Sequence, residues 1–227
     1  MSFEIKMLTG QIKVVTGLHI GSGNNEMHIG GTDNPVIKVA KGNSSEPYIP
    51  GSSLKGKLRS LLYLYTGSSE TNTAEIIAKL FGISADDKKN KNKIEEIKTT
   101  RLSFWDCFLT DAWRKNIEDR SIGFTEVKME NTINRITGTA EHPRNTERVI
   151  PETEFDFKLT IKVFDDEDLL DVILGTMKLL EMDSLGGSGS RGYGKIKFEN
   201  LQLDNLSVQD KFEAIKPFEK RFIEEQE

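Results

Sequence analysis

The chain has 227 residues, 36% of them hydrophobic and 30% charged, which is enough to bury the core of one elaborated domain. No run of 18 apolar residues and no apolar signal segment occurs, so we expect a cytoplasmic protein without a membrane-spanning helix. A single cysteine, Cys107, excludes an internal disulfide and a cysteine-cluster zinc site. The net charge of -5 argues against indiscriminate nucleic-acid binding, because neutralising phosphates requires lysine and arginine.

The first part of the chain predicts a strand, a loop region and a helix. Residues 3–14 alternate between apolar and polar side chains, which indicates one long strand or a hairpin. A region rich in Gly, Asn and Ser follows. Apolar residues then recur at helical spacing over 54–65, with Ser52 or Ser53 as the expected N-cap and Gly67 as the stop.

The middle of the chain has weaker periodicity. A short helix is expected around 76–81, and the Lys- and Asn-rich stretch 86–98 is typical of a solvated insertion. Apolar residues between 102 and 108 suggest a strand, and a helix is expected at 111–120. The stretch 124–149 is polar, with no apolar stripe long enough for a core element.

The last part contains the clearest strand of the sequence, at 155–163, where apolar and polar residues alternate without a fault. Asp165 and Asp166 are expected to cap a helix whose apolar face runs over 169–180. A glycine-rich loop leads into a final strand at 196–203, and a helical tail interrupted by Pro217 ends the chain.

Without its insertions the predicted order is strand, helix, strand, strand, helix, strand. This βαββαβ order predicts an α+β fold with a ferredoxin-like or RRM-like core. The core and its insertions are expected to span 1–206, and the insertions to occupy 17–50, 67–100 and 122–150, the last as a thumb-like β-hairpin. An acidic helical tail is expected over 207–227.

The glycine-rich loop at 186–194 is the strongest chemical signal. Five glycines in nine residues leave many backbone N–H groups unshielded, and a nest of such groups binds phosphate oxygens. Lacking a Gly-Lys-Ser/Thr sequence, the loop is no P-loop, and it could also be a flexible connector between helix and strand. The candidate phosphate ligands are Gly186, Gly187, Ser188, Gly189 and Arg191.

The start of the helix after residue 51 is a second candidate anion site. Its first turn presents free N–H groups at the positive end of the helix dipole. Lys55 and Arg59 are four residues apart and share one face, while Ser52 and Ser53 offer hydroxyl groups. This face suits a phosphate chain, although an ordinary capped helix with solvated lysines would have the same sequence.

A third segment contains His19 after the first strand and Asp33 in a glycine-flanked loop. His19 could contact RNA or satisfy a local hydrogen bond, and Asp33 is followed by the turn-forming pair 34–35. Aspartates in turns usually accept backbone hydrogen bonds, so the residues alone favour a structural role for Asp33 over a catalytic one. No Ser-His-Asp, Cys-His or zinc-ligand spacing occurs, so an ordinary hydrolase or zinc enzyme is not expected.

A fourth segment combines cations, amides and two isoleucines. A projecting hairpin here could insert an apolar tip, Ile133 or Ile136, between stacked bases while arginines hold the backbone. It could equally be a flexible surface excursion. The candidate RNA-binding residues of this segment are Asn131, Asn134, Arg135 and Arg144.

Five motifs resemble one protein family. Residues 15–21, 31–36, 49–56, 130–135 and 185–194 are similar to the RAMP superfamily, and more narrowly to the repeated Cas7-like backbone subunit of type III-A (Csm) CRISPR effector complexes. The resemblance runs from about Lys6 to Phe198. The charged insert at 86–98 and the acidic tail match no part of the pattern.

The resemblance implies a subunit that stacks head to tail along a guide RNA beside other Csm subunits, in antiviral defence. The helix start, His19 and the glycine loop would hold guide phosphates. The 131–148 hairpin would act as a thumb that displaces one base at each subunit boundary. Asp33 would then be the residue that cleaves complementary single-stranded target RNA at regular intervals, as a base or through a weakly held Mg²⁺ shared with the RNA.

Three alternatives share many of these features. An architectural backbone subunit would share every motif but have no active Asp33. A guide-precursor ribonuclease of the same superfamily would use His19 as its base. A free-standing phosphate- or nucleotide-binding enzyme would bind a mononucleotide as a monomer.

Overall fold

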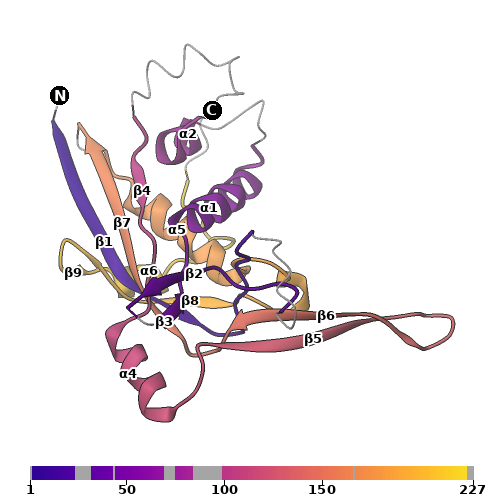
Figure 1. Cartoon of the computed structure of the whole chain (residues 1–227). Coiled ribbons are helices and arrows are strands. Elements are labelled where there is room, and N and C mark those ends of the chain that lie inside the picture. The colour runs from indigo at the N-terminus through magenta and orange to yellow at the C-terminus, as the bar shows by residue number, and fades with distance from the viewer. Residues whose placement is uncertain are drawn as a thin grey trace.

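The computed structural model describes residues 2–23, 32–42, 44–68, 75–83, 99–165 and 167–223, so the insert predicted over 86–98 lies outside the described residues. It has a mixed α+β architecture, with one central sheet, helices packed against it and two separate hairpins (Figure 1). None of the helices in these ranges is long and apolar enough to span a membrane. The elements are β1 (Phe3–Val14), β2 (Lys38–Lys41), β3 (Ser44–Pro47), α1 (Gly51–Thr66), α2 (Glu75–Phe81), β4 (Leu102–Phe104), α4 (Asp111–Arg120), β5 (Thr125–Ile133), β6 (Ala140–Val149), β7 (Glu154–Phe164), α5 (Leu170–Met182), the 3-10 turn η2 (Gly189–Arg191), β8 (Ile196–Leu203), β9 (Leu206–Ser207) and α6 (Gln209–Glu213).

The central sheet has the strand order β4-β7-β1-β8-β9, and every neighbouring pair is antiparallel. β1 lies in the middle, where Ile12 is opposite Phe155 of β7 on one side and Phe198 of β8 on the other. Alternate residues of β7 are buried, as its alternating sequence predicts. Gly10 sits at a register shift between β1 and β8, where a Cβ atom would come within 2.9 Å of the Glu199 carbonyl oxygen, so only glycine fits.

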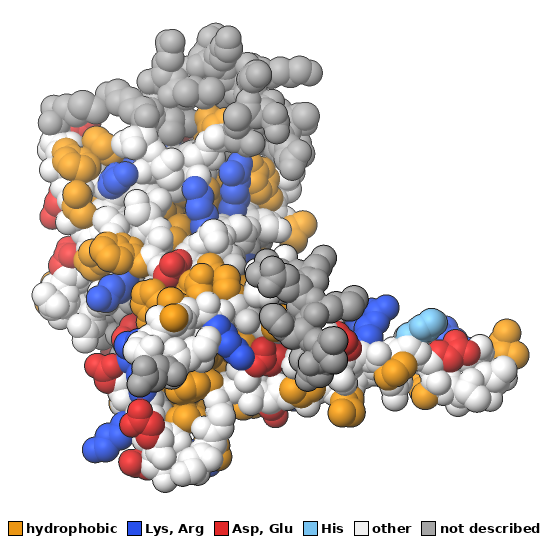
Figure 2. All heavy atoms as spheres, viewed as in Figure 1, with side chains coloured by type: hydrophobic (Ala, Val, Ile, Leu, Met, Phe, Trp, Pro, Cys, Tyr) orange, Lys and Arg blue, Asp and Glu red, His pale blue; other side chains and the backbone are white. Residues whose placement is uncertain are grey.

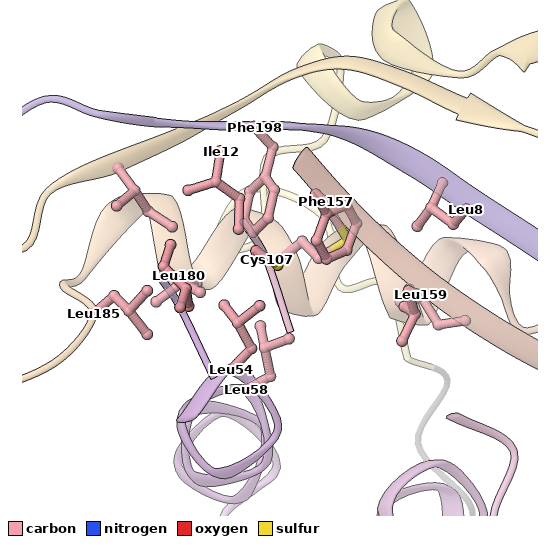
Figure 3. Close-up of a cluster of buried hydrophobic side chains, with 14 of the residues drawn as sticks. Leu8, Ile12, Leu54, Leu58, Cys107, Phe157, Leu159, Leu180, Leu185 and Phe198 are labelled. Carbon is pink, nitrogen blue, oxygen red and sulfur yellow. The ribbon is translucent and has the colours of Figure 1, made fainter. Parts of the chain in front are cut away.

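The hydrophobic core fills the space between this sheet and helices α1 and α5. Leu54 and Leu58 of α1 lie below Ile12 and Phe157 of the sheet, and Leu180 of α5 joins the same cluster (Figure 3). All five side chains are buried. The burial of these residues accounts for the helical spacing of leucines in α1, because every third or fourth position faces the sheet.

The start of α1 differs from the prediction. Ser52 and Ser53 lie inside the first turn, and the N-cap is Pro50, which makes no side-chain hydrogen bond to the helix. The first free N–H of the helix, on Gly51, instead donates to Asp106 Oδ1 at 2.8 Å. The predicted serine cap is therefore wrong, because a carboxylate 55 residues further along the chain takes its place.

Other helix boundaries agree with the sequence. α1 ends at Gly67, whose φ of 70° is the left-handed conformation that favours glycine. α2 ends before Gly82, with a φ of 83°. α4 has the predicted bounds, and the Thr110 hydroxyl caps it by accepting from the Trp113 amide.

The start of α5 is a second correction. Asp165 does not cap the helix, because its carboxylate accepts from the Ser2 amide at 2.8 Å. The helix begins at Leu170, whose amide donates to Asp168 Oδ1 at 3.2 Å. Asp166, the other predicted cap residue, lies outside the described residues.

The C-terminal segment is helical only in its first part. α6 ends at Glu213, and the described residues that follow it, up to 223, form turns. Pro217 has no amide proton to continue a helix, and its carbonyl accepts from the Tyr65 hydroxyl at 2.8 Å. The Phe222 ring stacks on Tyr65, with 4.5 Å between centroids, so this segment packs against α1.

The hairpin formed by β5 and β6 projects from the body of the molecule (Figure 1). Its root pairs Thr125 with Val149, and its tip carries Ile136, which is 96% exposed. The polar stretch predicted to stay outside the core is therefore a long antiparallel ribbon.

Replacing a core side chain should test the packing between sheet and helices. Leu159→Ala removes a side chain with no exposed surface and should lower the free energy of unfolding by about 2–5 kcal/mol through lost burial and a residual cavity. Leu64→Ala is the matched control, because Leu64 is 77% exposed on α1. Urea unfolding of the purified protein measures both, and equal losses in the two variants would contradict this core assignment.

Candidate nucleic-acid interface

The segment Gly17–Gly21, which follows the end of β1, connects three of the candidate site elements: the hairpin, the Asp33 loop and the glycine loop. Leu18 exchanges two backbone hydrogen bonds with Val149 at the root of the hairpin, at 3.0 and 2.7 Å. Two residues later the Ile20 carbonyl accepts from the Ile37 amide at 2.8 Å. One short segment therefore joins the central sheet to the hairpin and to the loop that contains Asp33.

The glycine loop packs against this same segment. The Gly187 amide donates to the His19 carbonyl at 2.9 Å, and the Gly194 amide donates to the Gly17 carbonyl at 3.0 Å. A Cβ atom on Gly186 would lie 2.3 Å from the His19 carbonyl oxygen, so this approach requires glycine. The glycines therefore serve close backbone packing as well as any ligand.

This packing reduces the predicted phosphate nest. The amides of Gly187, Arg191, Gly192 and Gly194 donate to carbonyls within the protein. Ser188 lies in the left-handed conformation, with a φ of 59°, and begins the short turn η2. The part of the nest that remains open to a ligand is therefore the turn around Ser188 and Gly189 rather than the whole loop.

Arg191, the predicted phosphate ligand, already has a partner. Its Nη1 lies 3.0 Å from Glu130 Oε2 on strand β5, and the buried Tyr193 hydroxyl donates to Glu130 Oε1 at 2.9 Å. Burial raises the pKa of Glu130, but the hydrogen bonds from Tyr193, Lys128 and Arg191 outweigh it and lower the pKa overall. This ionised carboxylate attaches the glycine loop to the middle of the hairpin, where Glu130 lies opposite Arg144.

The start of α1 presents the predicted cations. Lys55 is half-buried and makes no ion pair with any other described residue, while the Arg59 guanidinium donates to the Tyr63 hydroxyl at 3.1 Å. Between them, Lys57 pairs with Asp183 at 2.6 Å, just before the glycine loop. This ion pair brings α1 beside the glycine loop. Ser52 is exposed and Ser53 half-buried in the same first turn.

Asp33 is exposed beside the middle of the hairpin, where Asn145 lies opposite Met129. Its Oδ2 accepts from the Asn145 amide of β6 at 3.0 Å, and within the described ranges nothing donates to its other carboxylate oxygen. His19 contacts the same strand two residues further along, because its Nδ1 donates to the Glu147 carbonyl of β6 at 2.7 Å. Since that nitrogen is occupied, only Nε2 of His19 is available to a ligand.

A divalent metal would have few protein ligands here. No group of three or more His, Cys, Asp or Glu side chains gathers in a metal-binding arrangement among the described residues. The open oxygen of Asp33 fits one contact to a hydrated Mg²⁺, which keeps several of its waters in proteins. The donor set therefore fits a weakly held ion that also needs oxygens from a ligand.

Of the predicted RNA-binding residues in the hairpin, Asn134 has a structural role, and the others, as far as the chain is described, are exposed without one. Asn134 shapes the tip, because its Oδ1 accepts from the amides of Ile136 and Thr137 and its Nδ2 donates to Glu141. Asn131 lies at a register shift between β5 and β6 and is exposed.

Arg135 and Arg144 are exposed cations without ion pairs in the described part of the chain. Figure 2 shows cationic, acidic and apolar side chains interspersed along this projecting hairpin. Its tip lies far from the body, so Asn134 and Arg135 are not brought together with the residues around Asp33 (Figure 1).

Two acidic residues that the sequence analysis did not single out organise this surface. Glu130 connects β5 to the glycine loop, and Glu147 connects β6 to the loop after Asp33. Glu147 follows Thr146 and precedes Arg148 in a polar stretch, so nothing in the sequence distinguishes it from the surrounding charges. Only its burial in the folded chain does.

The comparisons with known proteins agree with this arrangement. A family model described as the RAMP superfamily matches residues 11–197. A protein of Streptococcus thermophilus named CRISPR system Cms endoribonuclease Csm3 is 44% identical over 218 residues, which are 91% of this chain and 92% of that protein. A protein of the same name from Mycobacterium tuberculosis is 41% identical over 212 residues, 86% of each chain.

Two solved structures have similar folds. A crystal structure of a Csm3-Csm4 subcomplex in the type III-A CRISPR-Cas interference complex matches with a TM-score of 0.53 and 28% identity, over 89% of this chain and 80% of that one. A type III-B Cmr-beta structure bound to cognate target RNA matches in fold, with a TM-score of 0.62 and 18% identity over 88% and 61%. The chain therefore belongs to the RAMP superfamily and, within it, to the Csm3 family.

Proposed function

We propose that the chain is a guide-RNA-binding backbone subunit of a type III-A CRISPR effector complex that cleaves complementary target RNA at regular intervals. The observation that carries this proposal is the exposed carboxylate of Asp33, which accepts from Asn145 on strand β6 of the projecting hairpin, two residues from the Glu147 carbonyl to which His19 donates. The names of the relatives, all endoribonucleases, support the activity. The subunit would work in the cytoplasm, together with further copies of itself and other Csm subunits.

We also infer an RRM-like, ferredoxin-like core for this subunit. The strand order β4-β7-β1-β8 supports this inference, since β1 and β7 are central and α1 and α5 each connect two strands. In this arrangement 1–206 forms the core with its insertions, 122–150 is the thumb and 207–227 is an added tail.

The guide backbone would follow the surface between α1 and the glycine loop. Ser52, Ser53 and Lys55 lie in the first turns of α1, near the positive end of its dipole, which favours anions. Arg59 lies one turn further along the same face, in the middle of the helix. The turn around Ser188 and Gly189 adds backbone amides. The Arg191 side chain is 58% exposed and uses Nη1 for Glu130, so its other N–H groups could reach a phosphate, but its charge is partly neutralised by that carboxylate and its contribution would be smaller than that of Lys55.

The hairpin would separate the guide–target duplex into short segments. Its tip offers Ile136, which is almost fully exposed, and the neighbouring cation Arg135 suits a phosphate there. Arg144 lies opposite Glu130, in the middle of the hairpin, and suits a phosphate closer to Asp33. Displacing one base would free the adjacent ribose to rotate, so that its 2′-OH lies in line with the neighbouring phosphate. Geometry of this kind supplies much of the acceleration in RNA cleavage.

Asp33 would act at that distorted linkage. Its open oxygen would accept the proton of the 2′-OH while the 2′ oxygen bonds to phosphorus and the bond to the 5′ oxygen breaks. The departing 5′ oxygen would take a proton from water. The products of such a step are a 2′,3′-cyclic phosphate and a 5′-hydroxyl. A hydrated Mg²⁺ held through Asp33, when bound, would supply charge neutralisation at the phosphate.

Guide-precursor processing by His19 is the second candidate function. The hydrogen bond from its Nδ1 to the Glu147 carbonyl leaves Nε2 as a possible base. Incubating the purified protein with repeat RNA, with and without a chelator, separates the two functions. Metal-independent cutting within the repeat would favour processing.

Substituting Asp33 tests the cleavage proposal directly. Asp33→Ala in the reconstituted complex should reduce target cleavage at least about a hundredfold, because a positioned base contributes about 10²–10⁴. Guide content and target affinity should stay unchanged. Asp119→Ala is the control, since Asp119 is an exposed aspartate on α4. Cleavage at the wild-type rate by the Asp33→Ala complex would leave the architectural alternative standing.

Substituting the cations of α1 tests the path of the guide. Lys55→Ala and Arg59→Ala should each weaken guide binding and reduce the dependence of log affinity on log salt by about 0.7, as expected for one phosphate contact on a single strand. Filter binding between roughly 50 and 200 mM salt measures the slope. Lys211→Ala, which removes a cation paired with Asp171, serves as control and should not change it. An unchanged slope in both α1 variants would place the guide elsewhere.

A further inference from the structure

The loop that carries Asp33 is paired with the hairpin like an additional strand. The Asn34 amide donates to the Asn145 carbonyl at 3.3 Å, and the Glu147 amide donates to the Asn34 carbonyl at 3.0 Å. Asn34 also forms a parallel bridge with Thr146. With the Asp33 carboxylate bonded to the Asn145 amide, the loop is held in a fixed register along β6.

The buried carboxylate of Glu147 stabilises this pairing through additional hydrogen bonds. Glu147 is 8% exposed, and its Oε2 accepts from the Val36 amide at 2.9 Å. Its Oε1 accepts from Lys38 Nζ at 2.6 Å and from the Thr125 hydroxyl at 2.7 Å. The three donors belong to the Asp33 loop, to β2 and to β5, so a single side chain on β6 connects three segments.

The same residue also orients His19, through its main chain. The Glu147 carbonyl accepts from His19 Nδ1, and its amide donates to Asn34. Burial raises the pKa of Glu147, but the hydrogen bonds from Lys38, Thr125 and Val36 outweigh it and lower the pKa overall. The carboxylate is therefore ionised at neutral pH and accepts from all three donors at once.

We propose that Glu147 is a positioning residue that holds the Asp33 loop in a fixed position on the hairpin. The position at which the hairpin binds the RNA then determines which phosphate faces Asp33. This inference rests on the proposed role of Asp33 in cleavage. Among the described residues, the donors to the Glu147 carboxylate lie in the Asp33 loop, in β2 and in β5, and none lies in the central sheet. Loss of this carboxylate should therefore loosen the loop rather than the core. A displacement of about 1 Å at a reacting group can reduce a rate about a hundredfold.

The first test compares two isosteric substitutions at the root of the hairpin. Glu147→Gln keeps the size of the side chain but loses the ion pair with Lys38 and one acceptor oxygen. Glu126→Gln is the matched control, because Glu126 pairs with Arg148 on the same hairpin and makes no hydrogen bond to the described part of the Asp33 loop. Each variant is reconstituted into the full complex, with Asp33→Ala as the baseline.

Glu147→Gln should slow single-turnover cleavage at saturating target by about tenfold to a hundredfold. Guide content and target affinity should remain within about twofold of wild type. Mapping of the cut ends should show cleavage spread over neighbouring linkages, which a general loss of folded protein would not produce. Glu126→Gln should cut at the wild-type rate and positions.

The second test measures how firmly the Asp33 loop is held, without measuring cleavage. Amide hydrogen exchange should become faster at Asn34 and Val36 in the Glu147→Gln protein, while amides of the core strand β7 keep their protection. If Glu147→Gln does not fold, Lys38→Gln removes one of the same hydrogen bonds from a more exposed position and should accelerate the same amides.

The outcomes are distinguishable. Unchanged exchange at Asn34 and Val36 would overturn the proposed role of Glu147, and so would faster exchange combined with wild-type cutting rate and positions. If the Asp33→Ala complex still cuts, the assignment of Asp33 fails, and the exchange measurement still decides whether Glu147 holds the loop.

Discussion

Main-chain pairing along Gly17–Gly21 is the constraint on which the candidate site depends. Backbone N–H and C=O groups that are buried away from water need hydrogen-bond partners, and the partners of this segment belong to three different parts of the chain. Leu18 pairs with the hairpin, Ile20 with the Asp33 loop, and the Gly17 and His19 carbonyls accept from the glycine loop. Because the glycine loop has no side chains at the points of contact, three segments far apart in the sequence converge on one stretch of five residues.

Acidic residues build this surface even though its ligand is proposed to be an anion. Glu130, Glu147 and Asp183 each pair with a cation from another segment, so their charges are neutralised locally. The net charge of -5 therefore says little about the potential over the site. It also follows that the number of lysines and arginines overestimates the cations available to RNA. Those without acidic partners in the described part of the chain, such as Lys55 and Arg144, should dominate the salt dependence.

Local signals in the sequence were sufficient for most elements and insufficient for their connections. Alternation identified β7, and α4 has the bounds expected from the sequence, because such patterns depend only on neighbouring residues. The hydrogen bond from Gly51 to Asp106 and the bonds from Val36 and Lys38 to Glu147 join residues that are at least 55 positions apart in the sequence, and only the bond from Thr125 to Glu147 is shorter in range. The periodicity of the sequence does not indicate such distant pairs. The candidate site was accessible through family motifs, whereas the residues that support it were not.

A single aspartate can be specific on a protein with 36 acidic residues only if its surroundings are supplied in part by the substrate. Asp33 has one oxygen held by a backbone amide and one open, on a loop fixed to the hairpin. The hairpin is the part of the molecule that reaches outward, so a strand distorted by it would be presented to this carboxylate at a constant distance. The active geometry would then exist only in the complex with RNA. Repetition of the same subunit would convert this fixed distance into a regular spacing of cuts.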